Sequence, residues 1–301
     1  MANDRNDFLP EVRNSAWWSG DSRLAANGRA NEAVLQKLGL MDRPDLSGVE
    51  VVQMGHVMQP VIGRLVQERL GIELRDADYA LQHPKEAWLK SHFDFITTDG
   101  KTLVEAKNYN GMTRNKFSEE SNIIPAADMA QLIHESACHG VDNVILAVLF
   151  GGNELVTFDF TITDQQREDL IKEMAVYWAA VQTQTPLPPE NSEQARRTWP
   201  VDRPGSVVTA TQEIERVALR LKQIKASIKG AEEEEERLLI AMQKVMSDHA
   251  EMVTVDGTVL ATWKAAKSTK RFDPKLFQSS MPDLYAKYVV DVPGSRRFLI
   301  K

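Results

Sequence analysis

Apolar residues recur at helical spacing in several stretches of the first 185 residues. In residues 54–70 they return every four positions, at Val57, Val61 and Leu65, and side chains at that spacing share one face of a helix. Gly71 follows directly, and glycine is typical of a helix C-terminus. The same reasoning predicts three more helices, at 32–40, 126–139 and 163–181.

Other stretches have the pattern of β-strands. Residues 143–150 form a continuous apolar run, NVILAVLF, which is typical of a buried strand. Alternation over 154–160 predicts a strand that pairs with it after a glycine-rich turn. Residues 87–97 and 102–107 predict two further strands, joined at Asp99-Gly100, and this dipeptide is a strong hairpin signal. Helices that alternate with strands indicate an α/β fold.

The composition changes between Pro186 and Pro204, where proline and polar residues replace the apolar ones. Such a stretch is typical of a linker. We therefore expect four parts along the chain: a mixed α/β domain (1–185), a proline-rich linker (186–209), a long helix (210–250) and a small α+β module (251–301).

A heptad pattern runs through the predicted long helix, which extends from about residue 210 to residue 249. A helix of roughly 40 residues is about 60 Å long. The apolar positions of the repeat are Ile214, Val217, Leu221, Ile224, Ile228, Leu238, Met242 and Val245. Ala231 and Glu235 occupy the same register as weaker positions. The pattern predicts a coiled coil or a helical hairpin, which serves self-association or the docking of a partner.

Charge and cysteine content narrow the class of protein. The net charge is −7, yet residues 264–301 hold nine Lys or Arg against three Asp or Glu, and such a basic tail attracts nucleic acid. A single cysteine, Cys138, excludes a disulfide scaffold and a four-thiolate metal site. No apolar run approaches the roughly 20 residues that span a bilayer. The first residues also lack the apolar core of a secretory signal, so we expect a cytoplasmic protein without a membrane partner.

The segment between His92 and Asn108 carries the most informative candidate chemistry. Asp94 falls on the first strand of the predicted hairpin, and Glu105 and Lys107 fall on the second. Strand residues two positions apart point to one face, so Glu105 and Lys107 project together. Pairing through the hairpin turn brings Asp94 alongside Glu105.

Two carboxylates and a lysine on adjacent strands suit the hydrolysis of phosphodiesters. Asp94 and Glu105 offer oxygen ligands for Mg²⁺, with Mn²⁺ as a substitute. A bound cation lowers the pKa of a water molecule and neutralises charge on a phosphate. Lys107 would position that water or help to deprotonate it, and would stabilise charge in the transition state. The alternative interpretation is an exposed hairpin in which Glu105 and Lys107 form an ordinary strand pair.

Predicted helices flank this hairpin on both sides. The upstream helix contains Gly55 and Gln59, and the downstream helix contains Gln131 and His134. This order of helix, Asp…Glu-x-Lys hairpin and helix with an inward Gln resembles the PD-(D/E)XK nucleases. More narrowly, it resembles the YqaJ/lambda-exonuclease family of phage recombination exonucleases. The resemblance covers roughly residues 13–185.

The motifs match this family to different degrees. The Glu-x-Lys and Gln-x-x-His motifs match fully, whereas Gln59 stands where the family has an acid. Both neighbours of Asp94 are phenylalanine, where the family has proline and glycine. Glutamine is neutral, although its oxygen can still bind a cation. We therefore expect a lower affinity for a second cation, and either a one-metal site or a weakly active enzyme.

The resemblance implies a restriction-endonuclease-like core, with a central mixed sheet flanked by helices, followed here by the long helix and the basic module. It implies a Mg²⁺-dependent 5′→3′ exonuclease that acts on linear double-stranded DNA, releases mononucleotides and leaves 3′ single-stranded tails. It also implies a homo-oligomer, a trimeric ring. Such enzymes hand the tail to a phage single-strand annealing protein in the cytoplasm of a bacterial host cell.

The resemblance also assigns roles to the residues of the metal site. Asp94 and Glu105 would bind the metal, with the backbone carbonyl of Ala106 and the side chain of Gln59 as further ligands. Gln131 would orient the scissile phosphate or the attacking water.

Four more residues are implied as contacts to DNA. Arg13 would bind the terminal 5′-phosphate, because a guanidinium matches the geometry of a phosphate. Arg23 competes for the same role. Ser22 would donate a hydrogen bond to a phosphate oxygen nearby, and His134 would contact the DNA or the metal.

Two other functions remain open from the sequence. The first is another nuclease of the same superfamily, either an endonuclease or a single-strand nuclease, which would share the fold and differ in its dependence on DNA ends. The second is a catalytically weakened DNA-binding or scaffold protein that acts through the coiled coil. Gln59 supports this second function, whereas the intact Asp94, Glu105 and Lys107 argue against it.

Overall fold

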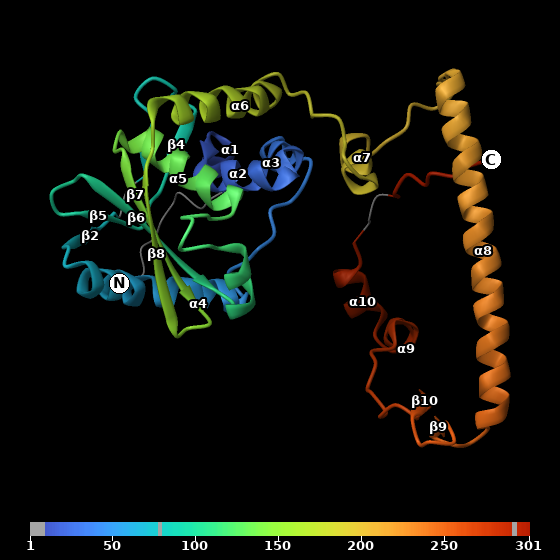
Figure 1. Ribbon diagram of the computed structural model, residues 1–301. Coiled ribbons are helices and arrows are strands. Elements are labelled where there is room, and N and C mark those ends of the chain that lie inside the picture. The colour runs from blue at the N-terminus through green and yellow to red at the C-terminus, as the bar shows by residue number, and fades with distance from the viewer. Residues whose placement is uncertain (1–9, 78–79, 291–293) are drawn as a thin grey trace. The chain divides into compact units, whose positions relative to one another are not determined.

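The computed structural model describes residues 10–77, 80–290 and 294–301 (Figure 1). The chain divides into two compact units, Met1–Pro200 (unit 1) and Val201–Lys301 (unit 2). Unit 1 is a mixed α/β structure that holds every candidate site residue, and unit 2 contains the long helix.

A five-stranded sheet forms the centre of unit 1, with the strand order β2-β5-β6-β7-β8. β6 and β7 are parallel, and all other neighbours are antiparallel. The sheet is therefore mixed, as expected. Its strands are β2 (Leu74–Asp76), β5 (Phe95–Thr97), β6 (Thr102–Tyr109), β7 (Asn143–Phe150) and β8 (Glu154–Thr161).

Helices cover both faces of this sheet (Figure 1). The helix α4 (Glu50–Leu70) packs Ile62 and Val66 against one face. The helix α5 (Ala126–His139) packs Leu132 against the other face. Because both faces are covered, β7 is buried at all positions but its first, which explains its unbroken apolar sequence.

A second layer of helices surrounds α5. The helices α2 (Ser19–Leu24), η2 (Ala25–Arg29) and α6 (Asp164–Gln182) contact α5, and α3 (Ala30–Lys37) packs against these three. The short α1 (Pro10–Asn14) precedes them. A buried ion pair fixes α2 to α3, with 2.6 Å between Lys37 Nζ and Asp21 Oδ2. Lys37 Nζ also donates to the carbonyl oxygen of Ala16 at 2.5 Å, so its charge is compensated although its side chain has no exposed area.

The predicted strand 87–97 is wrong in one respect, because it is two strands that belong to different sheets. β4 (Leu89–Ser91) lies in a three-stranded sheet with β1 (Trp17–Trp18) and β3 (Leu81–Gln82), in the order β1-β4-β3. β5 joins the central sheet. The chain leaves regular strand structure between them, at residues 92–94, so Asp94 is positioned by a bend and not by a strand.

The expected linker 186–209 also differs from the structure. It contains α7 (Ser192–Thr198), which belongs to unit 1 and contacts α3. Asn31 Nδ2 donates to Oε1 of the buried Gln194 at 2.9 Å. A buried side-chain hydrogen bond is a specific tertiary contact, and the proline-rich composition of this stretch gave no sign of it.

Unit 2 begins with a stretch that has no regular secondary structure and then forms α8 (Gln212–Met246), a helix of 35 residues. β9 (Glu251–Val253) and β10 (Val259–Thr262) pair as an antiparallel hairpin around Asp256-Gly257, and Gly257 adopts a φ of 85° in its turn. Two short helices follow, α9 (Pro274–Ser280) and α10 (Pro282–Tyr288).

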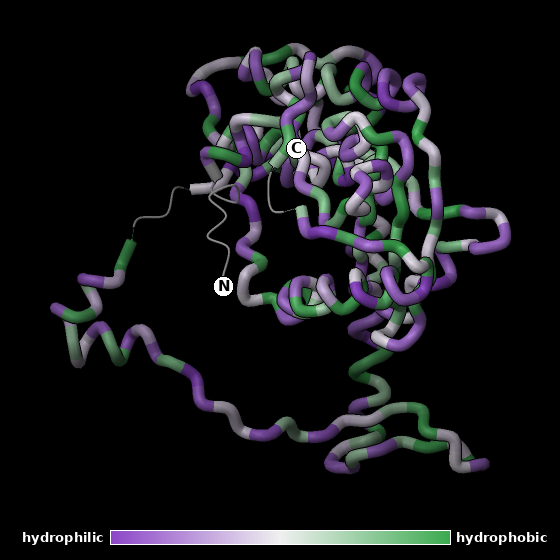
Figure 2. The backbone as a smooth tube through the Cα atoms, turned by 90° about the vertical axis from the view of Figure 1, so that its left-hand side faces the viewer, coloured by the Kyte–Doolittle hydropathy of each residue, from purple (hydrophilic) through white to green (hydrophobic). Residues whose placement is uncertain are grey.

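Hydrophobic and hydrophilic residues are interspersed along the backbone of both units (Figure 2). Within the described residues, no helix combines the length and the apolar character needed to cross a membrane.

Two glycines of α4 provide a test of how tightly this helix packs beside the bend at Asp94. A Cβ added at Gly63 would lie 2.7 Å from Cζ of Phe95, whereas one added at Gly55 would meet no atom within 4 Å. We expect Gly63→Ala to lower the free energy of unfolding by about 1–3 kcal/mol, because of this overlap. Gly55→Ala should raise it by up to about 1 kcal/mol, because alanine favours the helix. Urea denaturation measures both, and equal effects of the two substitutions would contradict the packing described.

Candidate active site

The candidate site lies where β5 begins beside β6, just after Asp94. Phe95 pairs with Val104 and Ile96 with Leu103, so Asp94 is next in line with Glu105, as the hairpin predicted. Beyond this pair, β6 no longer has β5 as a neighbour. The Asp94 carboxylate takes over, and its Oδ2 accepts a hydrogen bond from the backbone N–H of Ala106 at 2.8 Å. The bend in the chain thus fixes a carboxylate against the edge of β6.

Glu105 and Lys107 project from the same face of β6 and contact each other directly. Lys107 Nζ lies 2.6 Å from Glu105 Oε1. Gln131, on α5, donates from Nε2 to the same oxygen at 2.6 Å. The Lys107 side chain keeps 19% of its surface exposed and that of Glu105 keeps 6%, so the cluster is nearly buried but reaches solvent at the lysine.

Glu135 is a member of this cluster that the sequence analysis missed. It lies one helical turn beyond Gln131 on α5, and Gln131 Nε2 donates to Glu135 Oε1 at 2.8 Å. Its residue surface is only 1% exposed. The spacing of Gln131 and Glu135 is the sequence signal for this contact, because residues four apart on a helix are neighbours on one face. A glutamate on a helix usually faces solvent, so its burial depends on what packs against that face.

The electrostatics of the cluster follow from burial of several carboxyl groups around one lysine. Burial, and then the nearby Glu105 carboxylate, raise the pKa of Asp94 to about 8. The same two causes raise the pKa of Glu135 well above its ordinary value. Burial opposes the charge of Lys107, but Glu105 and Asp94 outweigh it and raise the lysine pKa. The cluster therefore holds more acidic groups than the single lysine can neutralise, so an added positive charge would stabilise the charged forms of its acids.

A hard divalent cation fits this donor set. Asp94 and Glu105 supply carboxylate oxygens, and Mg²⁺ is commonly held by one or two carboxylates, with phosphate and water completing its shell. Among the residues that the structure describes, no group of three or more His, Cys, Asp or Glu side chains is arranged to hold a metal ion. The neighbour of Asp94 on α4 is an amide, since Gln59 Nε2 donates to Asp94 Oδ1 at 2.8 Å. The residues thus fit one cation held by two carboxylates.

Ser22 and His134 lie together but away from solvent. Trp17 Nε1 donates to Ser22 Oγ at 3.1 Å, and Ser22 Oγ lies 2.8 Å from His134 Nδ1. His134 Nε2 lies 3.0 Å from the carbonyl oxygen of Lys90. A carbonyl only accepts, so Nε2 carries the proton and Nδ1 accepts from Ser22. Ser22 is fully buried and His134 is 1% exposed, so this arrangement ties α2, α5 and β4 together inside the protein.

The two arginines considered for the 5′-phosphate have different surroundings. The guanidinium of Arg13 lies over the ring of Trp18, 4.7 Å from its centre. Arg23 donates from Nη2 to the hydroxyl of Tyr109 at 2.8 Å and from Nε to Asp128 at 3.0 Å. Tyr109 is two residues beyond Lys107 on the same face of β6. Arg23 is therefore the arginine joined to the strand that carries Glu105 and Lys107.

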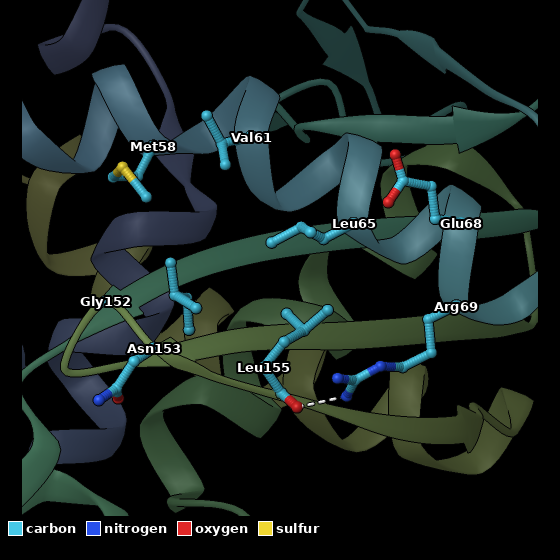
Figure 3. Close-up of a pocket in the computed structure, with 9 residues that line it drawn as sticks. Met58, Val61, Leu65, Glu68, Arg69, Gly152, Asn153 and Leu155 are labelled. Carbon is cyan, nitrogen blue, oxygen red and sulfur yellow. Dashed lines mark hydrogen bonds between the residues drawn. The ribbon is translucent and has the colours of Figure 1, made fainter.

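A separate cavity of about 470 Å³ lies between α4 and the turn that joins β7 to β8 (Figure 3). Arg69 is one of its lining residues and donates to the carbonyl oxygen of Leu155. Its lining residues are Met58, Val61, Leu65, Glu68, Arg69, Leu149, Gly152, Asn153 and Leu155. None of the carboxylates of the cluster lines this cavity, so it is distinct from the candidate site.

His134 gives the folded state a dependence on pH. Burial lowers the pKa of His134 from 6.5 to about 4, so the unfolded chain binds a proton that the folded chain excludes. The free energy of unfolding should fall by roughly 3 kcal/mol as the pH drops through this window. His134→Gln removes this contribution, and the exposed His56→Gln serves as a control. Urea denaturation at several pH values measures it, and parallel curves for wild type and His134→Gln would refute the assignment.

Comparisons with known proteins give matches only among solved structures. No protein-family model matches the chain, and the search of curated proteins finds no match. The alkaline exonuclease LHK-Exo from Laribacter hongkongensis is 16% identical, covers 58% of this chain and 91% of its own, and has a TM-score of 0.49. Its complex with dAMP is 17% identical, covers 57% and 91% of the two chains, and has a TM-score of 0.48.

A phage-related exonuclease from Haemophilus somnus 129PT is 12% identical, with 52% of this chain and 80% of its own covered and a TM-score of 0.41. The solved structures similar to this chain thus include exonucleases, at low identity. An assignment of activity to this chain therefore depends on its own residues.

Proposed function

We propose that this chain is a divalent-metal-dependent DNA nuclease, and specifically a 5′→3′ exonuclease on linear double-stranded DNA. The observation that carries the proposal is the cluster at the edge of β6. There, Asp94 accepts from the backbone of Ala106 while Glu105 contacts both Lys107 and Gln131. Burying these acids together lowers the stability of the folded chain. Clusters of this kind are typical of functional sites, and the binding of a cation together with a phosphate would account for this one.

The reaction is hydrolysis of the phosphodiester bond. A water oxygen forms a bond to phosphorus, the bond from phosphorus to the 3′ oxygen breaks, and that oxygen leaves with a proton. The products are a mononucleotide and a strand that is one nucleotide shorter, with a new 5′-phosphate. Asp94 and Glu105 would hold Mg²⁺ or Mn²⁺, which would supply a lower pKa for a water molecule and positive charge beside the phosphate.

The side chains around these acids have separate roles in the proposal. Lys107 is held as an ammonium group by its contact with Glu105, so it acts as a donor that positions the attacking water and stabilises charge on the phosphate. Gln131 donates to Glu105 and Glu135, and so it positions the Glu105 carboxylate. Arg23 is the candidate contact for the terminal 5′-phosphate, because its planar guanidinium suits phosphate oxygens.

The family resemblance alone supports three parts of the proposal: the 5′→3′ direction of digestion, the role in recombination and the protein partners. An enzyme of this kind leaves a 3′ single-stranded tail, which is the substrate of a phage single-strand annealing protein. The same resemblance supports a trimeric assembly and a location in the bacterial cytoplasm.

Digestion of three DNA substrates tests the proposal. The substrates are linear duplex with a 5′-phosphate, linear duplex without one, and a covalently closed circle, each with Mg²⁺ or with a chelator. We expect the wild-type chain to degrade linear duplex in Mg²⁺ only, to prefer the 5′-phosphate, and to release mononucleotides. Lys107→Ala should lower the rate by about 100-fold or more, because a donor to the transition state is lost.

Thermal denaturation controls for the folding of the Lys107→Ala variant. Cleavage of the closed circle would contradict the exonuclease assignment and favour an endonuclease of the same fold. Absence of metal-dependent cleavage on all substrates, with the DNA still bound, would contradict the enzyme assignment and favour a scaffold protein.

A further inference from the structure

The helix α8 presents an apolar face that its own unit leaves uncovered. Of the α8 side chains described, Met246 alone is buried. The large apolar residues in the a and d positions of the heptads are 37–74% exposed, apart from the half-buried Leu221: Ile214, Val217, Ile224, Ile228, Leu238, Met242 and Val245. A shallow groove of about 490 Å³ follows Val217, Leu221 and Ile224. Single helices are marginal in water without packing of such a face.

The repeat of this face specifies another helix as its occupant. Its positions alternate three and four residues apart through five heptads, from Ile214 to Val245. This spacing averages 3.5 residues, and apolar residues at that spacing form the contact surface, or seam, of a coiled coil. The a positions are Ile214, Leu221, Ile228, Glu235 and Met242, and the d positions are Val217, Ile224, Ala231, Leu238 and Val245.

The two halves of α8 carry net charges of opposite sign. Residues 212–230 hold five basic and two acidic side chains, a net charge of +3, and residues 231–246 hold two basic and five acidic ones, a net charge of −3. Two copies aligned in parallel would bring like halves together. Two antiparallel copies would bring each basic half against an acidic half, and such complementarity selects the orientation.

We propose that α8 pairs with α8 of a second copy of this chain as an antiparallel two-stranded coiled coil, centred between residues 229 and 230. In this register every a position faces a d position. The layers, each formed twice, are Ile214–Val245, Val217–Met242, Leu221–Leu238, Ile224–Glu235 and Ile228–Ala231.

The weak positions of the repeat support this register. Ala231 faces Ile228, so a small side chain meets a large one, and Glu235 faces Ile224 in the half that carries the lysines. A parallel pair would instead place Ala231 against Ala231, which leaves a void, and Glu235 against Glu235, which brings two carboxylates together in the seam.

The flanking charges select the same orientation. Antiparallel helices bring e positions of the two copies together, and here Lys225 lies near Glu232 of the other copy, twice in each dimer. Parallel helices pair g with e positions, which would set Arg220 against Lys225. The antiparallel pair therefore gains attraction at the position where the parallel pair has repulsion.

Cysteine cross-linking of the full chain tests the orientation. Val217→Cys and Met242→Cys variants are prepared separately, with different mass tags, and the chain's own Cys138 is buried. Oxidation of the mixture should give a cross-linked heterodimer between the two variants, and either variant alone should give little product. Homodimers within each separate variant would show parallel pairing and overturn the proposal.

Charge reversal tests the register without cysteines. Lys225→Glu and Glu232→Lys, each alone, should weaken the dimer about tenfold in sedimentation equilibrium, because two contacts per dimer become repulsive. The double variant should restore the affinity. Lys222→Glu changes the charge equally at a position outside the seam and serves as the control. A chain that is monomeric up to high concentration, or one that forms trimers whose stability these substitutions do not change, would overturn the proposal and would point to its own tail as the cover of α8.

Discussion

The hydrogen bond from the backbone N–H of Ala106 to the carboxylate of Asp94 organises the candidate site. It forms just before β5 begins, where β6 extends beyond β5, so a side chain takes the place of the neighbouring strand along β6. It places Asp94 in line with Glu105 and leaves the other oxygen of Asp94 facing Gln59 of α4. On the far side of Glu105, Gln131 of α5 completes the cluster. Both covering helices and the open edge of the sheet therefore meet at one group of acids.

This arrangement opposes the stability of the folded chain. Burial and the proximity of Glu105 raise the pKa of Asp94, which means that the folded protein disfavours the charged form of this acid. Lys107 and the amides of Gln59 and Gln131 offset part of this cost. A group of buried acids with perturbed pKa values, served by one lysine, is typical of a catalytic site and is rare in a purely structural core.

The helix α5 contributes side chains to two separate hydrogen-bond networks, one in the candidate site and one in the core. Gln131 and Glu135 face β6 and the acids. His134 is bonded to Ser22 and to the backbone of β4, within the core. The Gln-x-x-His motif of the sequence joins one residue of each network. Spacing along the helix could not separate them, because the separation depends on which elements pack against each face.

The sequence predicted those features that local pattern determines. α5 and β7 have the predicted bounds. Gly71 and Gly140 follow α4 and α5 with positive φ, at 64° and 71°. The shared face of Glu105 and Lys107 follows from strand alternation. Features that depend on tertiary packing were not predictable: the division of residues 87–97 between two sheets, the inward direction of Glu135, and the docking of α7 on α3.

The exposed seam of α8 was predictable from the sequence only in part. Its heptad repeat was evident from the sequence, and the structure adds that the described part of unit 2 leaves this face uncovered. The distribution of charge then gives the direction of pairing, which periodicity alone does not contain.

Binding of Mn²⁺ to the full chain, counted by the loss of the free-ion EPR signal, tests the cation site at Asp94 and Glu105 most directly. We expect one bound ion, an affinity that falls by about tenfold or more in Asp94→Asn, and an affinity that rises in Gln59→Glu, where a carboxylate replaces the amide. The exposed Gln53→Glu on the same helix, with the same change in charge, should leave the affinity unchanged. Equal binding by wild type and Asp94→Asn would contradict the assignment of this cluster as a cation site.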